Sequence, residues 1–179
     1  MPRLKNLEKS QAPSKSQPMM AELESKKMLL NIFRAMANSP AVLDAFLKFS
    51  GALREGKLDA KTRESIALVV AQSNCTEYCL SAHTVLGKQA GLDDAAIRDA
   101  RLGRAADRKT SAAIVLAQKV AATKGNVSDA DVSSARSAGL DDGDIAEVVA
   151  NVALNVFTNY FNNLNQVEVD FPKVTVGIA

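Results

Sequence analysis

The sequence predicts an all-α protein, a compact antiparallel helical domain that contains an internal helix–turn–helix repeat. Three observations lead to this prediction. Apolar residues recur at helical spacing along most of the 179-residue chain, and glycine, proline or aspartate stands where helices can end or begin. No run of alternating apolar and polar residues is longer than the C-terminal tail. Apolar residues make up 47% of the chain, which is enough for one substantial core in a single domain.

Composition argues against several classes of function. A net charge of +2 without a dense basic patch argues against nucleic-acid binding. No apolar run reaches the roughly 18 residues of a membrane span, and the N-terminus lacks the apolar core of a secretory signal. Two cysteines in a chain of this length do not form a disulfide scaffold. We therefore expect a cytoplasmic protein that binds neither nucleic acid nor membrane, and a close cysteine pair that is catalytic or redox-active.

The chain divides into an arm and a domain. Residues 1–18 are polar, basic and interrupted by proline, so we expect a flexible N-terminal arm. Such an arm is either a disordered tail or a segment that binds a partner. Residues 19–179 are expected to form the single helical domain.

Three helices are expected in the first part of the domain. The first runs from about residue 21 to 37 with an apolar face. Pro40 opens a second helix, which ends before Gly56, because proline is well tolerated in a first helical turn. Asp59 or Thr62 then caps the third helix.

An internal repeat organises the second half of the chain. The sequence Gly-Leu-Asp-Asp begins at Gly91 and again at Gly139, each time with isoleucine three positions after the second aspartate. In each copy the glycine ends one helix and an aspartate caps the next. A further helix is expected at about 108–123. The last helix, from about 142 to 163, is apolar on much of its circumference, which suggests a subunit interface, and the tail from 167 to 176 is expected to be coil.

The residues capable of chemistry gather in the stretch ESIALVVAQSNCTEYCLSAH, which begins at Glu64. It holds the only two cysteines, Cys75 and Cys79, and the only histidine, His83. These three are spaced four and four, so a helix covering all of them would align two thiols and an imidazole on one face. If a helix begins near residues 74–76, Cys79 lies in or near its first turn, where the dipole and free N–H groups favour a thiolate. His83 is then one turn further on, within reach as a base or a cationic partner.

Each of these residues also has an ordinary structural interpretation. Cys79 can be a buried structural thiol, His83 a core imidazole, and Glu64 a carboxylate that begins its helix. Whether Cys75 can form a disulfide with Cys79 is left undecided by the sequence. Residues four apart on a helix lie about 6 Å apart at Cα, which is within disulfide range. The same four residues could bind zinc in principle, although a single helical stripe presents ligands poorly to a tetrahedron.

The stretch resembles the core motif of the AhpD-like alkylhydroperoxidase and carboxymuconolactone decarboxylase family. That motif is a Glu, eleven residues, then C-x-[HY]-C-x-x-x-H. Glu64, Tyr78, Cys79 and His83 match it, whereas its first cysteine falls on Thr76. Cys75 lies one residue earlier, so the chain reads CxxxC where the peroxidase members read CxxC. Two flanking segments, NIFRAMANSPAVLDAFLKFSGAL and NVALNVFTNYFNNLNQVEVDFP, resemble helices of the uncharacterised peroxidase-related branch, and the likeness covers most of residues 29–173.

The resemblance implies an AhpD-like helical fold and a thiol-dependent peroxidase. Cys79 would attack a hydroperoxide, Cys75 would resolve it, Glu64 and His83 would move protons, and Tyr78 would support the pocket. An external dithiol would act as reductant, with no cofactor or metal ion. The family also implies a homo-oligomer, as a dimer, trimer or hexamer. A carboxymuconolactone decarboxylase-like enzyme and a non-enzymatic helical redox or interaction protein remain the alternatives.

Overall fold

The structure confirms the all-α prediction. The computed structural model describes residues 2–177, and this part of the chain contains nine α-helices, a 3₁₀ turn at Lys9–Gln11 and no strand. The helices are α1 (Gln17–Ser25), α2 (Asn31–Met36), α3 (Pro40–Arg54), α4 (Ala60–Ser73), α5 (Glu77–Gln89), α6 (Asp94–Arg101), α7 (Arg108–Thr123), α8 (Asp129–Ser137) and α9 (Asp142–Asn165).

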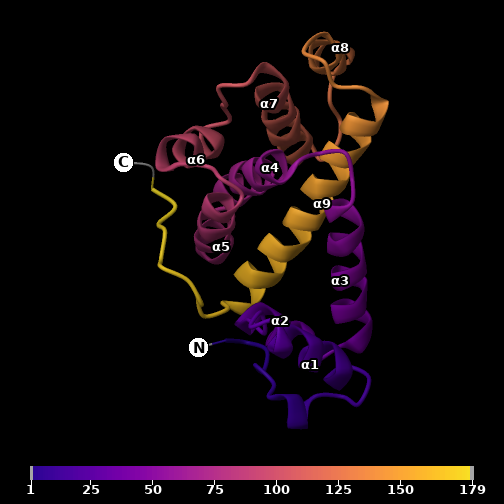
Figure 1. Ribbon diagram of the computed structural model, residues 1–179, viewed down its shortest axis with the longest axis vertical. Helices are drawn as coiled ribbons and strands as arrows, with labels where there is room; N and C mark the ends of the chain where they lie inside the picture. Colours follow the sequence, from indigo (N-terminus) through magenta and orange to yellow (C-terminus); the bar gives the residue numbers. More distant parts are fainter. Residues whose placement is uncertain (1, 178–179) are drawn as a thin grey trace.

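Helix α4 is the centre of the fold. It packs against α5, α6, α7 and α9, which surround it in Figure 1. Every residue from Ser65 to Ala71 is buried. This run is small or aliphatic apart from its first residue, as expected for a helix that contacts neighbours on all sides. The helix is therefore a rigid base for Glu64, which it carries one residue before the buried run.

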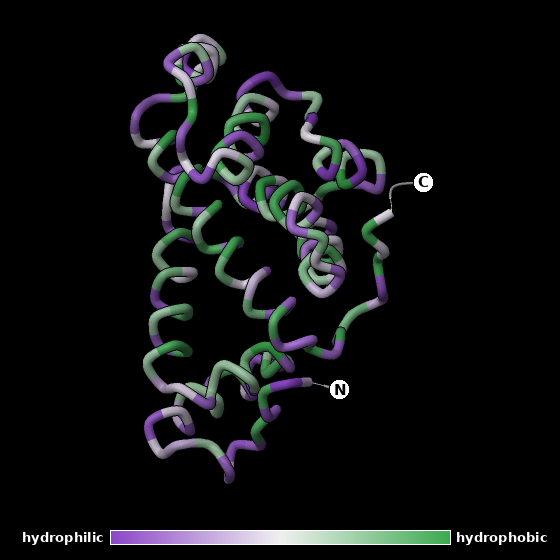
Figure 2. Tube along the Cα trace, turned by 180° about the vertical axis from the view of Figure 1, so that it is seen from behind, coloured by the Kyte–Doolittle hydropathy of each residue, from purple (hydrophilic) through white to green (hydrophobic). Residues whose placement is uncertain are grey.

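Helix α9 is the longest helix and packs against α3, α4, α5 and α7 (Figure 1). The C-terminal tail that follows it returns along α5 and α6, where Val174 N–H donates to Ser81 Oγ at 2.9 Å and Arg101 donates to the Thr175 carbonyl at 2.8 Å. Figure 2 shows hydrophobic and hydrophilic residues mixed along the helices. Within residues 2–177, no helix combines the length and the hydropathy needed to cross a membrane.

The helix expected at 21–37 is in fact two helices, α1 and α2. Lys27, between them, has a left-handed φ of 55°. The N–H of Lys27 donates to the Glu24 carbonyl at 2.9 Å, and the N–H of Met28 donates to the Leu23 carbonyl at 2.8 Å. These two bonds form the Schellman motif that ends many helices. The prediction was wrong because lysine occupies the left-handed position, where glycine would have signalled the end.

Residues 2–18, expected to form a flexible arm, lie against the helices. Arg3 N–H donates to the Asn165 carbonyl at 2.9 Å, and Leu7 N–H donates to the Arg34 carbonyl at 3.3 Å. The Leu7 side chain is buried in the core cluster. The mobility of this segment in solution, and the domain boundary at residue 18, stay predictions.

The capping predictions are confirmed at three helix starts. Asp59 accepts from the N–H of Thr62 at the start of α4, with a distance of 2.8 Å. In the repeat, Asp93 caps α6 and Asp141 caps α9 through the same type of bond. Helix α7 has the bounds expected from the sequence, and the C-terminal tail has no regular structure. The motif stretch, residues 64–83, therefore runs from α4 through the following corner into α5.

Candidate active site

Cys75 lies in the corner between α4 and α5. Asn74 caps α4, and Cys75 follows it with a left-handed φ of 52°. The N–H of Cys75 donates to the Gln72 carbonyl at 3.2 Å, and the N–H of Thr76 donates to the Ala71 carbonyl at 3.1 Å. This is again the Schellman arrangement, whose left-handed position usually belongs to glycine. Cys75 therefore lies outside α5, and only Cys79 and His83 share a face of that helix.

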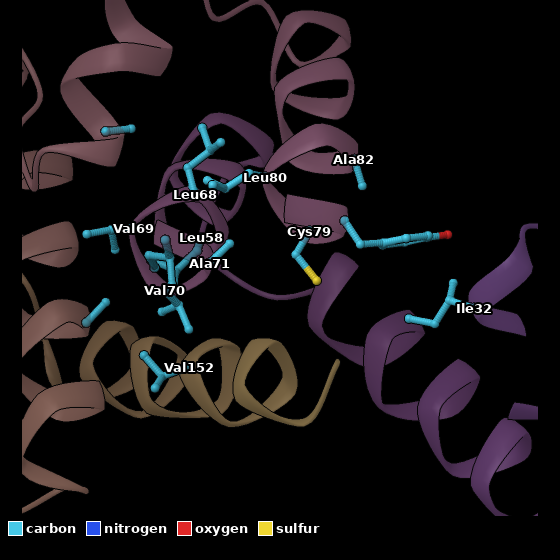
Figure 3. Close-up of a cluster of buried hydrophobic side chains, with 14 of the residues drawn as sticks. Ile32, Leu58, Leu68, Val69, Val70, Ala71, Cys79, Leu80, Ala82 and Val152 are labelled. Carbon is cyan, nitrogen blue, oxygen red and sulfur yellow. The ribbon is translucent and has the colours of Figure 1, made fainter. Parts of the chain in front are cut away.

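Cys79 lies in the first turn of α5 and points into the core. Only 3% of its surface is exposed. Figure 3 shows its sulfur directed away from α5 into the cluster of buried apolar side chains. The side-chain amide of Asn162, on α9, donates to Cys79 Sγ with a nitrogen–sulfur distance of 3.2 Å. The thiol is thus held in a mostly apolar site with one direct polar contact.

Burial raises the pKa of the Cys79 thiol. The side chains of Asn162, Asn159 and Thr158 oppose this effect, in that order, but do not outweigh it. The expectation that the first helical turn would favour a thiolate is therefore wrong for this site, because a charged sulfur loses its hydration there. Cys79 rests as a neutral thiol near pH 7, and a base must take its proton when it reacts.

Glu64 and His83 form a hydrogen-bonded pair between α4 and α5. Nδ1 of His83 lies 2.7 Å from Oε2 of Glu64, and the two side chains are only 19% and 22% exposed. Since a carboxylate can only accept, Nδ1 of a neutral His83 carries the proton and Nε2 carries the lone pair. His83 follows Cys79 by about one turn along α5, the spacing at which two residues lie on the same face of a helix.

A pocket of about 360 Å³ opens beside the α4–α5 corner. Its wall includes the exposed Cys75 and the buried Asn162. Cys79 does not line the pocket, but its sulfur is bonded to the Asn162 side chain. Both cysteines are free thiols in this structure. The pocket is therefore lined both by the exposed cysteine and by the residue whose side chain contacts the buried one. The other lining residues are Thr76, Glu77, Tyr78, Asn163, Gln166, Val167, Glu168, Val169 and Lys173.

Tyr78 joins the start of α5 to the C-terminal tail. Its hydroxyl donates to the Asp170 carboxylate at 2.6 Å, and its ring meets Phe171 edge-on with centroids 6.0 Å apart. Burial raises the pKa of Tyr78, and Asp170 raises it further. Tyr78 therefore remains a neutral donor that fixes the tail beside the pocket.

The structure brings Glu64 into contact with His83, one helical turn from Cys79, and leaves Cys75 apart at the surface. The zinc interpretation finds no support in the described part of the chain. Among residues 2–177, no three or more His, Cys, Asp and Glu side chains are placed to hold a metal ion.

Sequence reasoning missed the polar face of α9. Five asparagines of this helix are buried, and they recur every three or four residues along it. A pattern of amides at helical spacing could have revealed the face, but the apolar residues between them were interpreted as a subunit interface. The buried asparagines are Asn151, Asn155, Asn159, Asn162 and Asn165.

Comparison with protein families supports the motif. A model of the carboxymuconolactone decarboxylase family matches residues 40–123, the segment from α3 to α7 that holds Glu64, both cysteines and His83. Residues 40–123 are a carboxymuconolactone decarboxylase-family segment. The resemblance inferred from the motif is thereby confirmed. Among curated proteins, no sequence matches the chain.

Solved structures confirm the AhpD-like fold. An AhpD-core, uncharacterized peroxidase-related protein from Ralstonia eutropha JMP134 superposes with a TM-score of 0.84 at 22% identity, covering 94% of this chain and 92% of the other. An uncharacterized peroxidase-related protein from Silicibacter sp. TM1040 gives 0.79 at 23% identity, covering 93% and 89%. A cysteine-to-alanine variant of the debrominase Bmp8, in complex with 2,3,4-tribromopyrrole, gives 0.76 at 16% identity, covering 92% and 89%.

Proposed function

We propose that the protein is a thiol-dependent peroxidase in which Cys79 reduces a hydroperoxide. The observation that carries this proposal is the 2.7 Å pair of Glu64 and His83, in which His83 follows the buried Cys79 by one turn of α5. A buried thiol with a raised pKa needs a base, and an oriented imidazole is the side chain suited to that task near neutral pH. The pocket beside the site would admit a small hydroperoxide.

In the first step His83 Nε2 takes the proton from Cys79 Sγ. The thiolate attacks the terminal peroxide oxygen, so that a sulfur–oxygen bond forms and the oxygen–oxygen bond breaks. The departing alkoxide takes a proton from His83 and leaves as an alcohol. Cys79 is thereby oxidised by two electrons to a sulfenic acid, and the hydroperoxide is reduced by two electrons.

In the second step the Cys75 thiol attacks the sulfenic sulfur. A disulfide forms, the sulfur–oxygen bond breaks, and the hydroxyl leaves as water after taking a proton. An external dithiol then exchanges with the disulfide, returning both thiols and becoming a disulfide itself. The exposed position of Cys75 suits this exchange, because the reductant must reach one of the two sulfur atoms.

Replacement of each cysteine tests these assignments, with cumene hydroperoxide as substrate and dithiothreitol as reductant. We expect Cys79→Ser to lose turnover. Cys75→Ser is expected to react once and then to accumulate Cys79 sulfinic acid under excess peroxide, as seen by mass spectrometry. Full turnover by Cys79→Ser would exclude it as the nucleophile, and rapid cycling by Cys75→Ser without overoxidation would exclude Cys75 as the resolving thiol.

A decarboxylase acting on a lactone is the second candidate, because the matching family carries that name. Such an enzyme needs no cysteine chemistry. The Cys79→Ser variant therefore separates the two reactions, because a decarboxylase would keep its activity and a peroxidase would lose it. His83→Ala is expected to inactivate the decarboxylase. The AhpD-like fold also includes the debrominase Bmp8, so a bromopyrrole belongs among the substrates assayed.

We also propose that the protein is a homo-oligomer that uses the outer face of α9. This face carries large apolar side chains that remain exposed, with Tyr160 at 61% and Leu164 at 58%. Phe157 and Val149 continue the same stripe toward the helix start. Exposed apolar groups gathered in this way are typical of an interaction surface. A second copy of the chain would cover them.

A further inference from the structure

Four of the five buried asparagines of α9 fall into two groups, and the fifth, Asn165, accepts from the N–H of Leu4 at the end of the helix. Asn155 satisfies its amide nitrogen within the helix, by donating to the Asn151 carbonyl at 2.8 Å, and Asn151 donates to the Glu147 carbonyl in the same way. Asn159 and Asn162, further along, have no such bond to their own helix. Their amides belong to the surroundings of Cys79 instead.

Asn162 and Asn159 face the thiol with amides that are incompletely partnered by protein. Asn162 Nδ2 donates to Cys79 Sγ, and its Oδ1 has no partner. Asn159 is fully buried, and its Oδ1 accepts from Nδ2 of Asn74 at 3.0 Å. That bond fixes the amide, so Asn159 Nδ2 remains a donor without a hydrogen-bond partner. Buried polar atoms are nearly always bonded, so unpartnered ones beside a reactive group call for a functional explanation.

We propose that Asn159 and Asn162 form an amide pair that solvates the sulfur of Cys79 in place of water. Asn162 donates to the sulfur directly, Asn159 supplies the second donor, and Asn74 is a positioning residue that acts through Asn159. The pair favours the thiolate when His83 takes the proton, and its free donor faces the oxygen that Cys79 gains. This inference rests on the proposed thiol chemistry at Cys79.

The influences on the pKa of Cys79 agree with this role. The interior around Cys79 is apolar, and burial is the main cause of its raised pKa. The amides of Asn162 and Asn159 both act in the opposite direction. Hydrogen bonds to a charged acceptor are among the stronger polar contacts, so two donors limit the penalty of a buried thiolate without introducing a second charge.

The test measures the protonation of Cys79 without any peroxide. In the full chain with Cys75→Ser, so that only Cys79 reports, the rate of alkylation by iodoacetamide is followed against pH. Asn162→Leu keeps the size of the side chain and removes the donor. We expect its alkylation midpoint to rise by about one pH unit, which makes alkylation about tenfold slower near pH 7. Asn159→Leu should move the midpoint in the same direction.

Asn155→Leu is the matched control, because it is equally buried on the same helix face but bonds only to its own backbone. It should leave the midpoint unchanged. Equal midpoints in Asn155→Leu and Asn162→Leu would overturn the proposal. If Asn162→Leu fails to fold by circular dichroism, Asn74→Ala decides instead. An upward shift supports the pair, and no shift refutes it.

The alkylation result is independent of the proposed peroxidase activity. If Asn162→Leu shifts the alkylation midpoint but the parent protein turns over no hydroperoxide, the proposal of the amide pair stands and the proposal of a peroxidase is wrong. If the midpoint does not shift but the protein turns over hydroperoxide, the proposal of a peroxidase stands and that of the amide pair is wrong.

Discussion

Replacing Cys75 with glycine should stabilise the fold and slow the proposed catalytic cycle. Cys75 is exposed and has a φ of 52°, at the left-handed position of the corner between α4 and α5. A left-handed conformation costs an L-residue about 1–2 kcal/mol, whereas glycine adopts it freely. Glycine also loses more backbone entropy on folding, about 0.5–1 kcal/mol. The difference is a gain of about 0–1.5 kcal/mol, with a midpoint of about 0.75 kcal/mol, or roughly 2–3 °C in melting temperature for a chain of this size.

Differential scanning calorimetry measures the gain, and Lys27→Gly is the matched control. Lys27 has a φ of 55° and the same pair of Schellman bonds at the end of α1, but lies far from the motif in sequence. Both variants should melt at a higher temperature. A lower melting temperature for Cys75→Gly, with a higher one for Lys27→Gly, would refute the reasoning, because it would mean that the Cys75 side chain stabilises the corner.

The same Cys75→Gly variant lacks the proposed resolving thiol. Under cycling with cumene hydroperoxide and dithiothreitol, we expect Cys79 to accumulate as sulfinic acid, whereas Lys27→Gly should cycle like the unmodified chain. A more stable protein with a slower cycle would show that the left-handed cysteine is kept for chemistry at the expense of stability. Unchanged cycling would assign the resolving step to the external thiol.

Three further predictions concern the base, the pH dependence and the surface. Glu64→Gln keeps the side-chain size but removes the charge that orients His83, so hydroperoxide turnover should fall by about 10²-fold or more while circular dichroism stays the same; unaffected turnover would exclude the pair. The free energy of unfolding should decrease as pH rises above about 8.5, because the pKa of Cys79 is higher in the folded chain and the unfolded chain loses its proton first. Chemical denaturation at several pH values measures this slope, which Cys79→Ser should reduce. Leu164→Asp should lower the mass found by analytical ultracentrifugation, whereas a monomeric parent protein at micromolar concentration would contradict the proposed interface.

Local sequence signals predicted a helix boundary correctly where an aspartate caps the start of the helix or a glycine follows its end. Asp93 and Asp141 cap the helices that they were expected to cap, and Gly91 and Gly139 adopt positive φ at the preceding turns. The break at Lys27 was missed because its left-handed conformation depends on hydrogen bonds rather than on a residue type that favours it. The sequence predicts such a turn only when its left-handed position holds glycine, the residue that usually occupies it.

The site was predicted in part, and the limit has a physical cause. The resemblance to the family motif implied that Glu64 and His83 act together, and the structure places the two side chains in hydrogen-bond contact. Nothing in the spacing indicated that Cys79 would be almost fully buried, so the direction of its pKa shift was wrong. The orientation of α9 was also hidden. The apolar circumference of this helix suggested a subunit interface, but it did not indicate that Asn162 would be buried while Tyr160 is exposed.

The displaced position of Cys75 bears on the proposed resolving step. On one continuous helix, Cys75 and Cys79 would lie at a fixed separation within disulfide range. In the structure Cys75 lies on the surface side of the corner, while the Cys79 sulfur is in the core and bound by Asn162. Resolution therefore requires the sulfenic sulfur to leave its amide donor, or the corner to open at its two Schellman bonds. We infer that the hydrogen bonds around Asn74, which joins the corner to Asn159, set how readily the two sulfur atoms meet.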